Sequence, residues 1–293
     1  MQGKVLRAQN SFFYVATREG LVEAKLRGRL KKERIAVVPG DDVELELTEG
    51  GAGVIERRCE RKSLLRRPLV ANIDQVVLVF AAREPDINPV LIDRFLVLAE
   101  WSKIERIILC INKMDLLEGD EAEIPALAAL YREIGYPVCL LSTVTGEGVA
   151  NMQSLVEGKT SVFAGSSGVG KSSLLNCLAP GIALSTGAVS EKIKRGRHTT
   201  RTAQLLPFAG GFLVDTPGFS ATELAEIEPC ALPGLFPEFR SFFGACRFQP
   251  CTHSHEPDCA VKEAVQAGSI EDSRYASYLE MLQQSVQRKK VYR

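Results

Sequence analysis

The sequence lacks the marks of exported and membrane proteins. Charged side chains such as Lys4, Arg7 and Arg18 interrupt the first thirty residues, so no continuous apolar segment of a secretory signal is present. No apolar run is long enough to span a bilayer. We therefore expect a cytoplasmic protein without a membrane partner, and interpret the eight cysteines as reduced thiols or metal ligands rather than disulfides.

The 293-residue chain also lacks net charge, internal repeats, long low-complexity segments and a coiled-coil pattern. Without a coiled coil we expect a monomer. Its 36 basic and 36 acidic residues are unevenly spread, because residues 1–67 carry fifteen Lys and Arg against ten Asp and Glu. Such an excess can neutralise nucleic-acid phosphates, although a solvated charged surface would show the same composition.

Three stretches that differ in composition and in the pattern of apolar residues predict three domains. Residues 1–67 read as short alternating segments separated by turn signals, which predicts a closed β-barrel. An oligonucleotide-binding (OB) fold is our first choice and an SH3-like barrel the alternative. Residues 70–222 alternate continuous apolar runs with helical patterns, as a parallel α/β sheet covered on both faces requires. Residues 223–293 begin rich in Pro, Phe and Cys and end in helical patterns.

The segment "GSSGVGKS" (165–172) has the spacing of a phosphate-binding loop. A strand pattern precedes it and a helix pattern follows it, as that loop requires. Glycines let backbone N–H groups approach phosphate oxygens, Lys171 would reach the β and γ phosphates, and Ser172 would hold Mg²⁺. The residues expected around the phosphates are Gly165, Ser166, Ser167, Gly168, Val169, Gly170, Lys171, Ser172 and Ser173.

Two loops after other predicted strands would recognise guanine. In "NKMD" (112–115), Asp115 can accept from the N1 and N2 hydrogens of guanine, which adenine lacks, while Asn112 fixes the loop and the Lys113 stem covers the base. In "STVTGEG" (142–148), Ser142 would brace Asp115, and the neighbouring Thr143 completes the expected loop. Since these loops follow parallel strands, we expect them at one edge of the sheet, which predicts a GTP site.

The remaining nucleotide contacts are predicted in "FLVDTPG" (212–218) and the polar segment 184–201. Asp215 would reach Mg²⁺ through water, and Gly218 would offer a backbone N–H to the γ-phosphate. A Thr hydroxyl in the polar segment would complete the Mg²⁺ shell only while the γ-phosphate is present, and we favour Thr200 over Thr199.

The order of these motifs is that of a circular permutation, because ordinary GTPases place the base-reading motif after the phosphate loop. The polar switch segment and "DTPG" therefore lead directly into residues 225–293. We hypothesise that a change at the γ-phosphate moves this C-terminal part.

Phe219 follows "DTPG", where Ras-like enzymes place a glutamine that orients the attacking water. An apolar side chain cannot orient water. Either a partner completes the site or another group approaches, and His198 is the nearest candidate in sequence, with an exposed loop histidine as the alternative. The expected catalytic set is therefore His198, Lys171 and Thr200.

A metal site is predicted in "CRFQPCTHSHEPDC" (246–259). Three thiolates and an imidazole match a closed, structural zinc site that leaves no position open for chemistry. The expected ligands are Cys246, Cys251, His253 and Cys259, with His255 as the alternative to His253. The other cysteines are expected to pack in cores, namely Cys59, Cys110, Cys139, Cys177 and Cys230.

This order of motifs, together with "RGRHTT" (195–200), "DTPGF" (215–219) and "FPEF" (236–239), resembles the RsgA (YjeQ/YloQ) family of circularly permuted bacterial GTPases over essentially the whole chain. The resemblance implies an N-terminal OB-fold, a permuted GTPase domain and a C-terminal zinc domain. It also implies a late assembly factor that binds the small ribosomal subunit and its rRNA, that the subunit stimulates, and whose release accompanies GTP hydrolysis. By the same resemblance, His198 assists hydrolysis and the three cysteines with His253 bind zinc.

Two classes of function compete. The first is a slow GTPase switched on by ribosomal RNA, and the second is an RNA-binding module in which nucleotide exchange alone sets affinity. An ATPase or nucleotide kinase is a third reading, which Asp115 opposes. We expect GTP or GDP, Mg²⁺ and one structural Zn²⁺ as cofactors, and no DNA partner.

Overall fold

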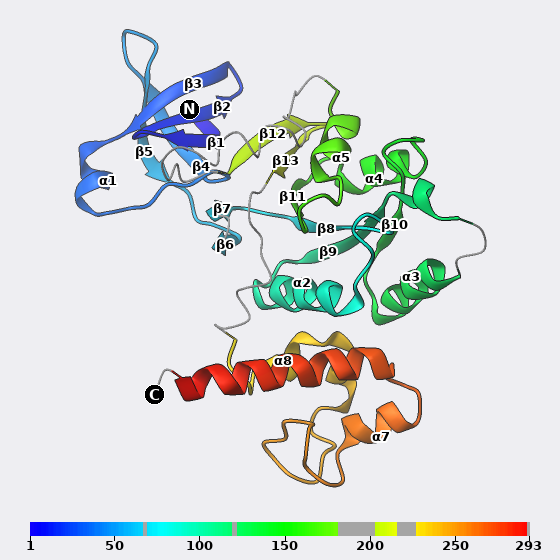
Figure 1. Ribbon diagram of the computed structural model, residues 1–293. Coiled ribbons are helices and arrows are strands. Elements are labelled where there is room, and N and C mark those ends of the chain that lie inside the picture. The colour runs from blue at the N-terminus through cyan, green and yellow to red at the C-terminus, as the bar shows by residue number, and fades with distance from the viewer. Residues whose placement is uncertain (67–68, 119–121, 181–202, 216–226, 292–293) are drawn as a thin grey trace.

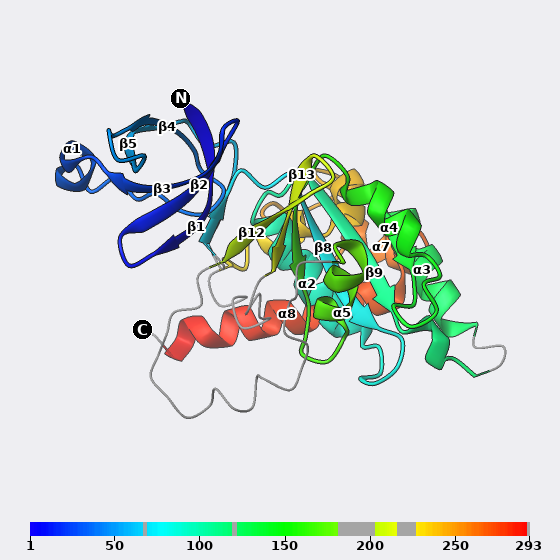
Figure 2. The ribbon, with the colours of Figure 1, turned by 90° about the horizontal axis from the view of Figure 1, so that it is seen from above.

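The computed structural model describes residues 1–66, 69–118, 122–180, 203–215 and 227–291, arranged as a barrel, a central sheet domain and a C-terminal helical module (Figure 1). Among the described residues, no helix combines the length and the apolar character needed to cross a membrane. The barrel and the C-terminal module contact different sides of the central domain (Figures 1 and 2).

The barrel consists of β1 (Gln2–Gln9), β2 (Phe12–Thr17), β3 (Gly20–Leu26), β4 (Asp42–Leu47) and β5 (Gly53–Arg58), with the short helix α1 (Gly28–Lys32) between β3 and β4. It closes in the order β1-β2-β3-β5-β4, and the pairing of β3 with β5 is parallel. This Greek-key order is that of the OB-fold, so the structure confirms our first choice over the SH3-like alternative. Alternating apolar residues such as Val5, Val15 and Ile55 fill its interior.

A two-stranded ribbon of β6 (Leu64–Arg66) and β7 (Leu69–Ala71) joins the barrel to the central domain. Hydrogen bonds hold the end of this ribbon against the barrel. Asn72 donates from Nδ2 to the Gly40 carbonyl at 2.9 Å and to Asp42 Oδ2 at 3.1 Å. These bonds attach the end of the ribbon to the base of the barrel.

The central sheet has the order β10-β9-β8-β11-β13-β12, in which only β12 is antiparallel to its neighbour. Its strands are β8 (Gln75–Ala81), β9 (Arg106–Asn112), β10 (Val138–Leu140), β11 (Thr160–Ala164), β12 (Gln204–Phe208) and β13 (Gly211–Asp215). Helices α2 (Pro89–Trp101), α3 (Glu123–Ile134), α4 (Val149–Val156) and α5 (Lys171–Leu178) and the short helix η1 (Met114–Leu116) connect them.

The continuous apolar runs follow from the two covered faces of this sheet. Successive residues of β8 pack into different cores, because Val76 and Leu78 belong to the layer of α2 and α3, whereas Val77 and Val79 belong to the layer of α4 and α5. Every residue of β8 is buried. A strand in this position cannot carry the polar alternation of a half-exposed strand.

The C-terminal module contains η3 (Leu232–Leu235), η4 (Pro237–Phe242), α7 (Ala260–Gln266) and α8 (Asp272–Val291). Helix α8 packs along α2 (Figure 1), and the aromatic rings of Phe236, Phe239 and Tyr278 belong to the same buried cluster as Ile92 and Phe95 of α2. The module therefore shares a core with the central domain.

Candidate nucleotide-binding site and metal centre

Three of the predicted nucleotide-binding loops meet at one edge of the sheet. Strands β8, β9, β10, β11 and β13 are parallel, so their carboxyl ends share that edge. The loops after β9, β10 and β11 begin there, at Lys113, Leu141 and Gly165. This is the edge at which open α/β sheets bind ligands.

The phosphate loop needs glycine at two positions for steric reasons. A Cβ at Gly165, where φ is +150°, would lie 2.1 Å from the Val79 carbonyl oxygen. A Cβ at Gly170, where φ is +91°, would lie 2.2 Å from Asn112 Nδ2. The loop is therefore packed closely against β8 on one side and the base-reading loop on the other.

Lys171 lies folded into the phosphate loop. Its Nζ donates to the carbonyls of Gly165 at 2.8 Å and Ser166 at 2.6 Å. Helix α5 begins at this residue, and its first turn closes with the bond from the Leu174 N–H to the Gly170 carbonyl at 2.9 Å. The arrangement places an ammonium group and the N–H groups of the first helical turn around one small space, which suits a phosphate.

Asn112 ties the guanine-reading loops to the phosphate loop. It is fully buried, its Nδ2 donates to the Val169 carbonyl at 3.0 Å, and its Oδ1 accepts from the Thr143 N–H at 3.2 Å. Val169 is itself buried in the core below α5. One amide side chain therefore links the base-reading loop to the loop after β10 and to the phosphate loop.

Asp115 is exposed and held in position by a buried hydroxyl. The Oγ of Ser142 donates to Asp115 Oδ1 and accepts from the N–H groups of Val144 and Thr145, each at 3.1 Å. The carboxylate keeps lone pairs directed at solvent for a base to use. The bracing predicted for Ser142 is thus present in the geometry.

Sequence reasoning missed one contact of this site. Lys113 has left-handed backbone, with φ at +62°, and its Nζ donates to the carbonyl of Glu84 in the loop after β8. Nothing in the residues around Glu84 indicated that its backbone carbonyl faces the base-reading lysine. The sheet order decides this contact. Strands β8 and β9 are parallel neighbours, so the loops that follow them, with Glu84 and Lys113, lie side by side.

Several predicted residues fall outside the described part of the chain. His198, Thr199, Thr200, Gly218 and Phe219 lie there. Asp215 ends β13, where its backbone pairs with Phe163 of β11, beside the start of the phosphate loop.

The prediction that five cysteines pack in cores is wrong for two of them. Cys110 and Cys139 are buried as predicted, but Cys177 and Cys230 are exposed. Cys177 lies on the face of α5 that turns toward the base-reading loops, and its Sγ donates to the Thr143 carbonyl at 3.6 Å. The short helix α5 has one buried face, formed by Leu174, Leu175 and Leu178, and position 177 is outside it.

Four side chains of the C-terminal module bring their sulfur and nitrogen atoms together. The ligand atoms of Cys246, Cys251, His253 and Cys259 all lie within 4.8 Å of one another. Sulfur–sulfur separations are 3.9 Å and 3.8 Å, and His253 Nδ1 lies 3.5 Å and 3.3 Å from the sulfurs of Cys246 and Cys259. Zinc bonds of about 2.3 Å to sulfur and about 2.0 Å to nitrogen give tetrahedral edges of about 3.8 Å and about 3.5 Å, so the four groups fit this ion.

The alternative ligand, His255, is not part of this group. It is exposed, and its Nδ1 pairs with Ser254 Oγ at 3.0 Å. His253 is buried, which lowers the pKa of its imidazole and keeps the ring in the neutral form that binds metal.

The loop around His253 is held by neighbouring groups. Glu256 accepts from the Thr252 N–H and hydroxyl, both at 2.7 Å, and from the Ser254 N–H at 3.0 Å. Burial raises the pKa of Glu256, but these hydrogen bonds together outweigh it and lower the pKa to about 2. Tyr275 donates to the His253 carbonyl at 2.7 Å, so α8 supports the metal loop directly.

A buried charge cluster joins the C-terminal module to the central domain. Arg274 of α8, only 1% exposed, donates to Asp93 of α2 and, at 2.7 Å from Nε and 3.2 Å from Nη2, to Glu238 of η4. Tyr131 of α3 donates to Asp93 at 2.6 Å. The negative partners raise the pKa of Arg274 although burial alone would lower it. The cluster spans four elements that are distant in sequence.

These features define a class of protein. A phosphate loop and a guanine-reading loop share one sheet edge in permuted chain order, between an OB-fold barrel and a module with a Cys₃His group. The RsgA GTPase family profile matches residues 57–225, and the RsgA N-terminal domain profile matches residues 2–55. The chain belongs to the RsgA GTPase family, a family of GTP hydrolases.

Individual relatives agree over the full length. The "Small ribosomal subunit biogenesis GTPase RsgA" of Caldanaerobacter subterraneus is 46% identical over 291 residues, which is 99% of this chain and 97% of that protein. The crystal structure of YjeQ from Thermotoga maritima matches with a TM-score of 0.85 at 41% identity, covering 97% of this chain and 98% of that one. The crystal structure of YloQ, described as a circularly permuted GTPase, matches with a TM-score of 0.84 at 38% identity, covering 98% and 95%.

Proposed function

We propose that this protein binds the small ribosomal subunit through its rRNA, acts in late maturation of that subunit, and is released when it hydrolyses GTP. The observation that carries the proposal is the guanine site, in which Asn112 and Ser142 hold the base-reading and phosphate loops together. Relatives named as small ribosomal subunit biogenesis GTPases support the partner. We also propose that the protein acts in the cytoplasm, as a monomer and without a DNA partner.

We assign roles to the site residues as follows. Asp115 reads the N1 and N2 hydrogens of guanine, and the N–H groups of the phosphate loop with Lys171 hold the phosphates. Ser172, Thr200 and Asp215 would hold Mg²⁺, which would supply positive charge against the phosphates. His198 would assist the attacking water in place of the glutamine that Phe219 replaces. The three cysteines with His253 would hold one Zn²⁺ that fixes the metal loop.

The barrel offers a face for RNA. Arg7 stacks over the ring of Tyr14 at 3.9 Å, and Lys25 lies over the ring of Phe12 at 4.6 Å. Both rings are half-buried on β2, two residues apart and therefore on the same side. Aromatic rings paired with cations bind single-stranded bases by stacking and phosphates by charge. We call Arg7, Phe12, Tyr14 and Lys25 the aromatic–basic face.

The test is GTP hydrolysis by the full chain with small ribosomal subunits, with large subunits as the control. We expect stimulation by the small subunit alone. No stimulation, with GTP-dependent binding to the subunit intact, would favour the module that is gated by nucleotide exchange. A His198→Ala variant that no longer hydrolyses GTP but still cycles on and off the subunit would show that release does not require hydrolysis.

A further inference from the structure

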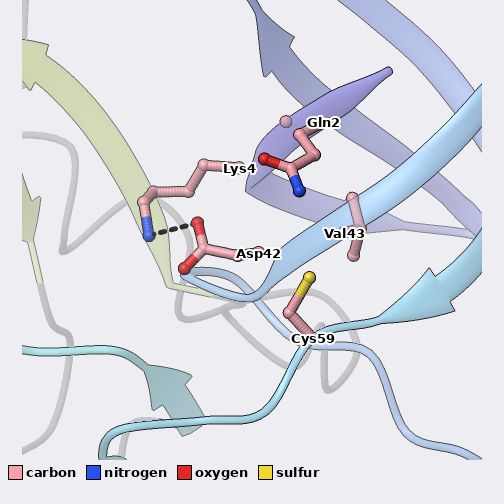
Figure 3. A pocket seen from close by; sticks show the side chains of 6 residues that line it. Gln2, Lys4, Asp42, Val43 and Cys59 are labelled. Atoms are coloured by element: carbon pink, nitrogen blue, oxygen red, sulfur yellow. Dashed lines mark ion pairs between the residues drawn. The ribbon is translucent and has the colours of Figure 1, made fainter.

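A pocket of about 260 Å³ lies on the barrel, between the starts of β1 and β4 and the chain that leaves β5 (Figure 3). Strand β1 contacts β12 here, and Lys4 Nζ lies 6.0 Å from the ring centre of Phe212 in β13. The lining residues are Gln2, Gly3, Lys4, Asp42, Val43 and Cys59. The volume is below the roughly 300–1,000 Å³ of pockets for drug-sized ligands, so it suits one group smaller than these.

The pocket continues the aromatic–basic face along β1. In the β1–β2 pairing, Arg7 lies opposite Tyr14 and Lys4 lies opposite Ala16. Tyr14 and Ala16 are two residues apart on β2, so their partners Arg7 and Lys4 point to the same outer side. Arg7 of the aromatic–basic face and Lys4 of the pocket therefore lie along one side of β1, a course that a single strand of RNA would follow.

The polar groups of the pocket match a nucleobase edge. Asp42 Oδ1 accepts from Lys4 Nζ at 2.8 Å and Oδ2 accepts from Asn72 at 3.1 Å, yet each carboxylate oxygen has a further lone pair. The half-exposed carboxylate can thus accept from an exocyclic amine, and the carbonyl oxygen of the Gln2 amide, whose N–H group bonds to Glu44, can accept beside it. Adenine, cytosine and guanine carry such an amine, whereas uracil would turn carbonyl oxygens toward the carboxylate.

We infer that this pocket receives one extruded nucleobase with an exocyclic amine, from single-stranded RNA held on the aromatic–basic face. The inference rests on the proposed RNA binding by the barrel. Asp42 and Gln2 contact the base edge, while Lys4 holds Asp42 in place through their ion pair. Lys4, which lines the pocket, lies 6.0 Å from the ring centre of Phe212 in β13, the strand that ends at Asp215 next to the phosphate loop.

The first experiment measures affinity by fluorescence anisotropy with the full chain. The probes are a short oligoriboadenylate and the same oligonucleotide built from purine riboside, which keeps the ring but lacks the amine. We expect the adenine oligonucleotide to bind about tenfold more tightly, because a well-placed base contact gives discrimination of that order. Asp42→Ala removes the acceptor and should abolish this ratio. Glu46→Ala makes the same truncation at an exposed position of the same strand and should leave the ratio unchanged.

The second experiment uses the unaltered protein. Cys59 lines the pocket, whereas Cys230 is exposed elsewhere, so oligoriboadenylate should slow maleimide alkylation of Cys59 and leave that of Cys230 unchanged in peptide mass spectrometry. Equal affinity for the two oligonucleotides, or no protection of Cys59, would overturn the inference. If small subunits still stimulate GTP hydrolysis in that case, the pocket assignment fails while the proposed function stands. If small subunits do not stimulate GTP hydrolysis by the unaltered protein, that result counts against the proposed function, independently of the pocket.

Discussion

Arg274→Met is predicted to destabilise the protein by about 4 kcal/mol, because breaking a buried ion pair costs about 3–5 kcal/mol. The substitution keeps most of the apolar volume of the side chain but removes its charge. Asp93 and Glu238, whose side chains are 2% and 10% exposed, would then be buried carboxylates without a cation. Most of the loss therefore comes from desolvated charge, not from a cavity.

The assay is urea unfolding followed by the fluorescence of Trp101, the one tryptophan of the chain, which ends α2 next to the C-terminal module. Arg240→Met is the matched control, since this arginine is half-exposed and pairs with Glu100 at 2.7 Å across the same junction. We expect that control to cost no more than about 1 kcal/mol. Equal losses for the two variants would refute the reasoning. A triple variant with Asp93→Asn and Glu238→Gln should recover part of the lost stability, because the orphaned charges are gone.

Further predictions concern the two sites and the C-terminal module. Asp115→Asn should weaken GTP binding about 10- to 150-fold. It should favour xanthosine triphosphate instead, because O2 of xanthine accepts a hydrogen bond where the N2 amine of guanine donates one. The measurement is competition between the two nucleotides for the variant, and an unchanged preference for GTP would contradict the assignment. Glu256→Ala should lower zinc affinity about tenfold in chelator competition, because it frees the loop around His253, whereas Asp258→Asn should not. The stability that Glu256 adds is complete above its ordinary pKa of 4.5 and declines as the pH falls to about 2, so Glu256→Gln should flatten acid unfolding in that window. Hydrogen exchange of residues 225–293 should differ between GDP and a GTP analogue, and identical exchange would end the hypothesis that the γ-phosphate moves this part.

Local patterns in the sequence were enough to predict three of the nucleotide loops and the metal group. In "GSSGVGKS", "NKMD" and the Cys-x4-Cys-x-His segment, the functional groups lie within a few residues of each other, and turn and strand signals place them. The strand pattern also predicted a covered parallel sheet, since its apolar runs fit no half-exposed strand. Parallel strands then required the loops to share an edge.

Contacts between distant segments were decided only by the tertiary structure. The sequence left the barrel type open, because short alternating strands suit both OB and SH3-like closure, and the β3–β5 pairing settled it. Exposure of Cys177 depended on which face of α5 is covered.

The Arg274 cluster and the pocket at Asp42 are further contacts between distant segments that the sequence did not predict. Arg274 and Asp93 are 181 residues apart, and each reads in the sequence as an ordinary charged position on a helix. Gln2 and Cys59 line one pocket only because β1 pairs with β4 at the end where the chain leaves β5. Sequence by itself determined the chemistry of each motif, since that chemistry is local. Which charges are buried together and which surfaces form a pocket depended on packing between segments that no short-range pattern links.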